Sequence, residues 1–468
     1  MVVPTIIPGN SVSGYEIDNS LRFNDGDSAK LGLAFGSGGN TKTWTVSCWF
    51  KRGIISSRQS FLNVGSGGSE YMSLYIDSDD KLYWVTESGG NTYRIGSSAL
   101  FRDPAAWYHI VFRQDTTDGT ANNRFRYYIN GAEVDTGAFN AQPTQNFDGK
   151  IGGNDTHYIG SNRDGDGEFM DGYLTDYNYL DGISYDPTYF GETDDNGVWI
   201  PKAYTGSYGG KGFFLEFQQT GTSANASGIG ADTSGNDNHW TPTNLAAIDV
   251  TTDTPTNNFA TFNSIFVNNR SGFTPSTLRE GNTGATGVNA DGNVSTIGFN
   301  KGKWYWEIKI VTRVSNDMNI YLLSIPGPHA GVSASRTMMW QAQDDLFFNN
   351  NQTNATKTAD LASFDDGDIV AVALDLDAST PNVILYKNGT ALNSGNAYNF
   401  NANERDGGNF IFPQVKITNT SDDVLINFGN PAFAISSSNA DANGYGNFEY
   451  AVPSGYYSLC TKNLAEFG

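Results

Sequence analysis

Residues 44–50 read WTVSCWF, and the apolar Trp44, Val46, Cys48 and Phe50 occupy every second position. A β-strand places successive side chains on opposite faces, so this period of two predicts a strand with one face on a hydrophobic core. Segments of the same kind follow at 71–76, 82–86, 107–112 and 125–129. The last of them ends in Asn130-Gly131, a pair that tolerates the positive φ of a tight hairpin turn.

A second stretch, residues 303–310, reads KWYWEIKI. Trp304, Trp306, Ile308 and Ile310 share one face of the predicted strand, and polar or charged residues alternate with them. Aromatic residues make up 13% of the chain, which suits pleated and half-buried surfaces. The 54 glycines, with many Asn and Asp residues, supply turns. Because a sustained helical stripe of apolar residues is missing from the sequence, we predict an all-β protein.

The chain is too long, at 468 residues, to form one hydrophobic core, and its length predicts two domains. Prolines and glycines interrupt residues 1–20, which we interpret as an N-terminal arm. We predict a first β-sandwich over 21–190 and a second over 256–468. Residues 191–255 form a bridging segment rich in Gly, Thr, Asn and Asp.

Charge and hydropathy argue against several function classes. The net charge of −22 disfavours binding to nucleic acid, which carries a dense negative charge. The sequence holds no run of about 18 apolar residues, so we expect no membrane insertion. The N-terminus also lacks the basic and apolar regions of a secretory signal.

Four motifs in the first half resemble the laminin-G-like, concanavalin-A-like domains. They are SCWFK at 47–51, WYHIVF at 107–112, YYING at 127–131, and HYIG at 157–160 followed by GYLTD at 172–176. Residues 232–239, DTSGNDNH, are similar to a stretch that commonly opens such a domain. The resemblance implies that the bridging segment folds back and completes the first sandwich; an ordinary interdomain linker is the alternative.

Four motifs in the second half resemble SPRY domains. They are KWYWEI at 303–308, GDIVAVALD at 367–375, LYKNG at 385–389 and INFG at 426–429. Because SPRY domains are also two-sheet sandwiches, the predicted fold is two tandem concanavalin-A-like, or jelly-roll, β-sandwiches.

Catalysis is not expected, although concanavalin-A-like folds include glycan hydrolases. Glycoside hydrolysis requires two carboxylates across a cleft. The E-x-D-x-x-E strand of the glucanase relatives is absent from the sequence, and the nearest pair, Asp375 and Asp377, falls where SPRY domains turn into a hairpin. Carboxylates from separate strands keep a polysaccharide depolymerase open as an alternative.

Residues 162–168, NRDGDGE, are the best candidate for a metal site. Asp164, Asp166 and Glu168 alternate with glycines that let a loop curl round Ca²⁺, which takes six to eight oxygen ligands. A solvated acidic turn is the alternative. We expect no required cofactor, with Ca²⁺ as the one candidate ion.

A saccharide site needs exposed aromatic rings beside polar groups. The candidates that lie near polar loops are Tyr83, Trp84, Tyr93, Tyr204, Tyr208 and Trp340. The chain holds 29 Phe, 24 Tyr and 9 Trp, so most of its aromatic residues must belong to the cores.

The order of domains, together with WIPKAYTG at 199–206 and SLCTKNL at 458–464, resembles virion proteins of marine tailed phages. The resemblance implies a bacteriophage tail fibre, spike or capsid (head) decoration, exposed on the virion after assembly in the host cytoplasm. Its expected role is adhesion to host glycans or to other virion proteins. The alternative is a structural decoration protein without glycan binding. The sequence lacks coiled-coil heptads, so it leaves open whether a homo-oligomer forms.

Overall fold

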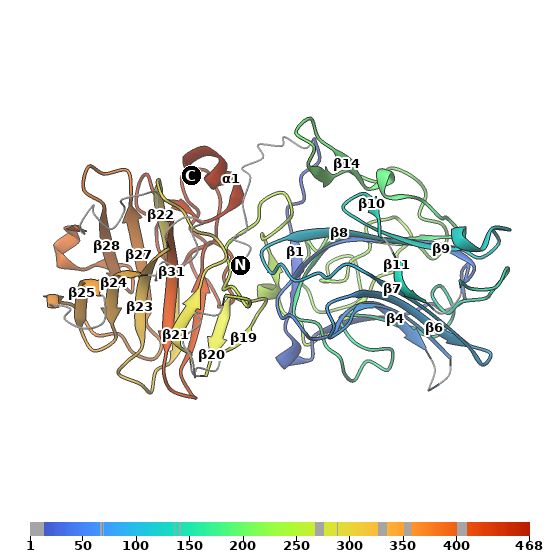
Figure 1. The fold of residues 1–468 in the computed structure, drawn as a ribbon, viewed down its shortest axis with the longest axis horizontal. Coiled ribbons are helices and arrows are strands. Elements are labelled where there is room, and N and C mark those ends of the chain that lie inside the picture. Colours follow the sequence, from blue (N-terminus) through green and yellow to red (C-terminus); the bar gives the residue numbers. More distant parts are fainter. Residues whose placement is uncertain are drawn as a thin grey trace. The chain divides into compact units, whose positions relative to one another are not determined.

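The computed structural model describes residues 14–468 except 66, 67, 69, 135, 140, 141, 267–275, 288, 326–334, 351–356 and 400–409. Most of the predicted N-terminal arm, residues 1–13, therefore lies outside the described residues. The chain divides into two compact units, Ser11–Thr256 and Asn257–Gly468 (Figure 1). Each unit is a β-sandwich, and we call them the first and the second sandwich.

The first sandwich consists of two antiparallel sheets. The β3 sheet has the strand order β10 (Ala132–Glu133), β9 (Phe125–Ile129), β8 (Trp107–Asp115), β3 (Thr43–Arg52), β13 (Gly172–Asp181), β1 (Ser20–Phe23) and β18 (Val250–Thr251), with β16 (Phe213–Leu215) also paired to β13. The β5 sheet has the order β11 (Thr136–Phe139), β7 (Asn91–Ser97), β6 (Leu82–Ser88), β5 (Tyr71–Ile76), β4 (Gln59–Gly65), β12 (Thr156–Ile159), β2 (Lys30–Ala34) and β17 (Thr241–Thr243).

Shorter elements complete the first sandwich. Strands β14 (Gly191–Thr193) and β15 (Trp199–Pro201) form a separate hairpin. The 3-10 helices are η1 (Asp25–Asp27), η2 (Ala121–Asn123), η3 (Pro187–Tyr189) and η4 (Ala247–Asp249). The bridging segment predicted over 191–255 supplies β16 and β18 to the β3 sheet and β17 to the β5 sheet. Trp240 from this segment is fully buried in the core between the sheets.

The core of the first sandwich confirms the alternation predicted for 44–50. Trp44, Val46, Cys48 and Phe50 all lie in the cluster between the two sheets. Trp49, on the opposite face of β3, is also buried, because it belongs to a second apolar cluster with Ile17, Trp107 and Tyr173. The outer face of the β3 sheet is therefore covered as well.

The second sandwich also has two sheets. The β22 sheet has the order β19 (Thr277–Arg279), β20 (Gly284–Thr286), β32 (Asp423–Asn427), β22 (Lys303–Thr312), β27 (Ile369–Asp375), β28 (Asn382–Lys387) and β29 (Thr390–Ala391), with β30 (Tyr398–Asn399) paired to β28 and β33 (Tyr457–Ser458) paired to β22. The β23 sheet has the order β21 (Asn289–Val294), β31 (Phe410–Ile417), β23 (Asn319–Ile325), β24 (Ser335–Gln341), β25 (Asp345–Asn350) and β26 (Lys357–Asp360). The helices are η5 (Asn393–Gly395) and α1 (Thr461–Phe467).

The core of the second sandwich confirms the alternation in 303–310. Trp304, Trp306, Ile308 and Ile310 lie between the sheets, whereas Tyr305 joins Phe448 in a cluster on the outer face. The fold is therefore all-β, with two successive sandwiches, as predicted. In the described part of the chain, α1 is the one α-helix, and no helix there has the length and apolar character needed to span a membrane.

Candidate functional site

A pocket of about 470 Å³ is formed by two loop segments of the first sandwich, one on either side of the β14–β15 hairpin. Its lining residues are Tyr185, Asp186, Thr188, Tyr189, Lys202, Ala203, Tyr204, Thr205 and Gly206. Beneath it, Phe190 packs on Leu180, Val111 and Tyr128, which come from β13, β8 and β9. The pocket therefore rests on the outer face of the β3 sheet.

Asp186 begins the short helix η3 and shapes one wall of the pocket. Its Oδ1 accepts hydrogen bonds from the backbone N–H of Thr188 at 2.9 Å and from the Thr188 hydroxyl at 2.6 Å. Pro187 follows as the first helical residue, where a missing N–H has no cost. This turn exposes Tyr189, and Asp186 Oδ2 has no hydrogen-bond partner among the described residues.

The opposite wall is the chain that leaves β15. The backbone N–H of Lys202 donates to the Phe190 carbonyl at 3.0 Å. Its ammonium group donates to the Thr188 carbonyl at 3.3 Å and lies 3.7 Å from a Glu192 carboxylate oxygen. Lys202 therefore ties the two walls together and keeps its charge at the rim of the pocket.

Three tyrosines, Tyr185, Tyr189 and Tyr204, line the pocket. Tyr185 and Tyr189 stack with centroids 3.8 Å apart and planes 3° apart, and Tyr189 is 42% exposed. Tyr204 stacks on Phe190 at 5.1 Å and meets Tyr208 edge-on at 5.1 Å. The Tyr204 hydroxyl donates to the Ser207 carbonyl at 2.7 Å, and burial raises the pKa of Tyr204 to about 12. Tyr204 is thus neutral and held in place.

The β14–β15 hairpin is fixed to the β3 sheet by a buried indole–imidazole contact. Trp199 Nε1 donates to His109 Nδ1 at 3.0 Å, and the His109 ring also contacts the ring of Trp49, with centroids 4.9 Å apart. Because Nδ1 accepts, the neutral ring carries its proton on Nε2, which lies 2.9 Å from the Ser47 hydroxyl. Complete burial lowers the pKa of His109 to about 3, so the ring is an uncharged structural partner.

A buried acid lies behind the pocket. Asp176 sits at a bulge of β13 with φ 48°, and the Tyr15 hydroxyl donates to its Oδ1 at 2.8 Å. Burial raises the pKa of Asp176 to about 7, and nearby Glu216 adds to the increase. Tyr208 donates to Asn178 at 3.0 Å from the same bulge and also contacts the pocket residue Tyr204. Through Tyr208, the bulge therefore supports the pocket residue Tyr204.

The structure separates the six aromatic residues predicted for a saccharide site. Tyr204 lines the pocket and Tyr208 supports it. Tyr83 lies on the outer face of the β5 sheet, and Tyr93 is 8% exposed within the core of the first sandwich. Trp84 and Trp340 are fully buried in the two cores, which corrects the expectation that they form an exposed binding face. Their strands present these side chains to the opposite sheet.

The predicted calcium loop uses its carboxylates for other contacts. Asp166 Oδ1 accepts from the Asn162 side-chain amide at 3.0 Å, and Glu168 pairs with Arg58 at 2.6 Å. Asp164 lies 3.8 Å from Arg163. The three carboxylates do not come together in the way that a cation site requires; calcium binding by this loop stays a prediction.

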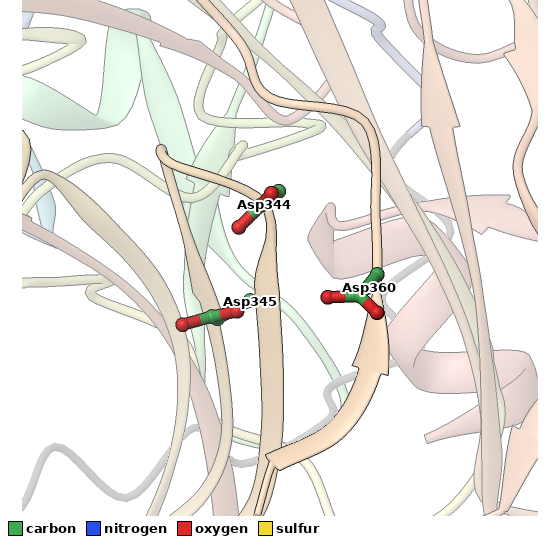
Figure 2. A group of neighbouring side chains, drawn as sticks. All are labelled: Asp344, Asp345 and Asp360. Atoms are coloured by element: carbon green, nitrogen blue, oxygen red, sulfur yellow. The ribbon is translucent and has the colours of Figure 1, made fainter.

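Among the described residues, one group of three carboxylates could share a cation. Asp344, Asp345 and Asp360 have carboxylate oxygens within 4.8 Å of one another, at the ends of β25 and β26 (Figure 2). Asp345 and Asp360 face each other across the two strands. Exposed acidic groups of this kind are common without an ion, so the cluster by itself does not identify a site.

The carboxylates of Asp375 and Asp377 are used in a turn. Asp375 Oδ1 accepts from the backbone N–H groups of Asp377 and Ala378, both at 2.9 Å. Asp377 Oδ1 accepts from the N–H of Gly302 at 2.8 Å. The pair therefore has the turn role that the sequence predicted.

Sequence reasoning missed Tyr185, Asp186 and Tyr189. The signal was present in residues 184–189, SYDPTY, because Asp followed by Pro predicts a helical turn and the two tyrosines lie four residues apart. That they form a pocket wall depends on the later segment 202–206, which no local pattern places beside them.

Comparisons with known proteins agree with the fold of the first half. Residues 24–183 match a family model described as the concanavalin A-like lectin/glucanases superfamily. No curated protein matches the chain.

Three solved structures illustrate the similarity. Domains LG4-5 of the mouse laminin α1 chain are 10% identical, with 95% of this chain and 99% of that chain covered and a TM-score of 0.31. The CBM40 of a Ruminococcus gnavus IT-sialidase, bound to α2,3-sialyllactose, is 17% identical, with coverage of 31% and 85% and a TM-score of 0.24. The SPRY domain of human HERC1 is 17% identical, with coverage of 31% and 87% and a TM-score of 0.23.

Proposed function

We propose that the chain is a glycan-binding protein and that the pocket between η3 and residues 202–206 holds the saccharide. The observation that supports this most is the stacked pair Tyr185 and Tyr189, which leaves 42% of Tyr189 exposed at the pocket. Sugar rings have an apolar face of C–H groups that packs on aromatic rings, and pockets of this kind add a few polar groups for orientation.

The polar groups of the pocket suit hydroxyl recognition. Asp186 Oδ2 can accept from a sugar hydroxyl, and the Lys202 ammonium group can donate to a sugar oxygen. The hydroxyls of Tyr185 and Tyr189 have no hydrogen-bond partner among the described residues. Each can donate to a sugar oxygen or accept from a sugar hydroxyl. Donors, acceptors and rings therefore converge on one ligand-sized space.

Binding without catalysis is part of the proposal. Of the residues that line the pocket, Asp186 is the carboxylate, and one of its oxygens already caps η3. Glycoside hydrolysis needs a second carboxylate about 5–9.5 Å away across the bond that breaks. A reducing-sugar assay on any glycan that binds tests this: release of sugar would establish a depolymerase.

We also propose the virion surface as the place where the protein works, as a fibre, spike or head decoration that adheres to host glycans or to other virion proteins. The resemblance of residues 199–206 to phage virion proteins supports this, and that stretch supplies Lys202–Gly206 of the pocket. Antibody labelling of intact particles by electron microscopy tests the location. Labelled particles support the proposal, and particles without the protein contradict it.

The binding proposal is tested with a glycan array probed with the full chain, followed by calorimetry on the best glycan. Tyr189→Ala should weaken binding about tenfold, because it removes the exposed stacking ring. Phe410→Ala is a matched control, since Phe410 is 40% exposed on the second sandwich. Wild-type binding that Tyr189→Ala leaves unchanged would place the saccharide elsewhere, and an array with no bound glycan would favour a purely structural protein.

Gly206→Ala provides a test of pocket shape. A Cβ at this position would lie 2.4 Å from the Tyr204 hydroxyl and 2.6 Å from the ring carbon that bears it. Tyr204 must then move, so we expect weaker glycan binding with an almost unchanged melting temperature. Unchanged affinity in this variant would show that Tyr204 does not contact the ligand.

A further inference from the structure

The outer face of the β5 sheet carries three arginine–tyrosine stacks. The guanidinium carbon of Arg94 lies 4.1 Å from the ring centroid of Tyr83. The corresponding distances are 4.3 Å for Arg58 over Tyr75 and 4.3 Å for Arg163 over Tyr71. A cation above an aromatic ring is attracted by the negative face of the ring, so each guanidinium has a defined position.

The strand register places these stacks along one surface. Tyr71 and Tyr75 are four residues apart on β5, so they share a face. Tyr83 lies directly opposite Tyr75 on β6. At about 3.3 Å per residue, the ring of Tyr71 is roughly 13 Å along the strand from the Tyr75–Tyr83 pair.

Arg58 has its hydrogen-bonding groups occupied. Its Nε and one terminal nitrogen donate to Asp77 at 3.3 and 3.2 Å, and the other terminal nitrogen donates to Glu168 at 2.6 Å. These contacts neutralise its charge and hold the carboxylates of Asp77 and Glu168 beside it. We therefore assign Arg58 a positioning role.

Arg94 and Arg163 differ from Arg58. Arg94 is 46% exposed, and its nearest ion-pair contact is Asp77 at 3.9 Å. Arg163 is 29% exposed, and its nearest is Asp164 at 3.8 Å. Neither side chain donates a hydrogen bond to any of the described residues. Apart from the buried Nε of Arg163, the N–H donors of the two guanidiniums suit a planar anion such as a carboxylate or sulfate.

We propose that this face is a second binding surface, for an acidic polysaccharide whose charged groups are separated by uncharged sugar units. The guanidiniums of Arg94 and Arg163, whose ion-pair contacts are long, would each pair with one anionic group. Asp77 and Glu168, which both pair with Arg58, repel a polymer with closely spaced charges, but they accept hydrogen bonds from hydroxyls. The net charge of −22 likewise disfavours nucleic acid, whose phosphates are closely spaced.

This surface is independent of the pocket. It lies on the outer face of the β5 sheet, and the pocket rests on the outer face of the β3 sheet of the same sandwich. The two sites share no residue, so failure of one proposal leaves the other standing.

The test measures binding of the full chain to dextran, to lightly carboxymethylated dextran and to heavily sulfated dextran, with polyglutamate and single-stranded DNA as further polymers. We expect the lightly carboxymethylated polymer to bind best, and to bind less well as salt increases, because exposed charges are screened. Dextran without charge should not bind.

Arg94→Gln/Arg163→Gln should weaken binding to carboxymethylated dextran at least about tenfold, because it removes two exposed charge contacts and each contributes about fivefold to the affinity. Arg126→Gln is the matched control, since Arg126 is 30% exposed and pairs with Glu133 on the β3 sheet. Melting curves check that the variants are folded, and Tyr189→Ala should leave this binding unchanged.

Two results with other polymers would overturn the proposal: uncharged dextran binds as tightly as carboxymethylated dextran, or the heavily sulfated polymer, polyglutamate or DNA binds more tightly. Two results with carboxymethylated dextran itself would also overturn it: the wild type does not bind it, or Arg94→Gln/Arg163→Gln binds it with unchanged affinity.

Discussion

The two outer faces of the first sandwich differ in how the chain treats them. On the β3 sheet, segments that precede and follow the sheet strands cover the outer face, and nine of the ten residues of β3 are buried. On the β5 sheet, the outer face is left to arginine side chains that lie over tyrosine rings. The covered face gains a pocket with fixed walls, whereas the open face gains a flat array of charges.

This difference determines how charges are accommodated. On the covered face, Lys51 and Asp253 form an ion pair of 2.7 Å with side chains 1% and 0% exposed, and Trp107 donates to Asp253 at 3.2 Å. On the open face, the pair of Arg58 and Asp77 stays in contact with water, with side chains 31% and 20% exposed. Buried charges require partners, and exposed ones do not.

The largest expected effect tests this contrast. Asp253→Ala leaves the Lys51 ammonium group buried without its carboxylate, and we expect a loss of about 3–5 kcal/mol in the free energy of unfolding. Asp77→Ala on the open face should cost about 1 kcal/mol or less. Chemical denaturation of both variants measures the difference.

A double variant controls for lost packing. Lys51→Met/Asp253→Leu removes both charges and should recover most of the stability lost in Asp253→Ala. Equal losses in Asp253→Ala and Asp77→Ala would contradict the contrast between the two faces.

The next effect concerns the acid beneath the pocket. Burial raises the pKa of Asp176 from 3.8 to about 7. At a pH between these two values, the folded protein therefore keeps a proton on Asp176 that the unfolded chain releases. This contribution to stability is fully present below about pH 4 and is lost as the pH rises to about 7. The difference between the two pKa values corresponds to about 4 kcal/mol as an upper bound.

Asp176→Asn isolates this contribution, because the amide keeps an acceptor for Tyr15 and cannot ionise. The stability of the wild type relative to Asp176→Asn should fall between pH 4 and pH 7 and then level off. A difference that does not change with pH would show that Asp176 is already ionised in the folded protein.

The smallest effect tests the anchor of the hairpin. Trp199→Phe keeps the ring above His109 but removes the Nε1–H that donates to Nδ1. We expect a loss of about 1–2 kcal/mol, since a buried acceptor loses its partner, together with a modest loss of glycan affinity. A fully stable variant would show that stacking alone holds β14 and β15.

Alternation in the sequence predicted central strands of both sandwiches and the faces that 44–50 and 303–310 turn to the cores. It could not distinguish Tyr83 from its neighbour Trp84, because both faces of β6 carry aromatic residues, and the face that meets the opposite sheet depends on distant strands. Tyr204 was found because it lies near polar loops. Its partners Tyr185 and Tyr189 are brought to it by the hairpin between them.

The acidic loop shows the same limit. Its spacing is suitable for calcium, but Arg58 is distant in the sequence and takes Glu168 in an ion pair. Long-range partners of this kind have no local signal, so charge pairing across a sheet is visible only in the folded chain.

The central claim is that the tyrosine pocket on the covered face binds a saccharide. Calorimetric titration of the best array glycan into Tyr189→Ala and into Arg94→Gln/Arg163→Gln tests it directly. We predict that the first variant loses about tenfold in affinity and that the second binds as the wild type does. Undiminished binding by Tyr189→Ala, with loss in the arginine variant, would contradict the claim and move the saccharide to the open face.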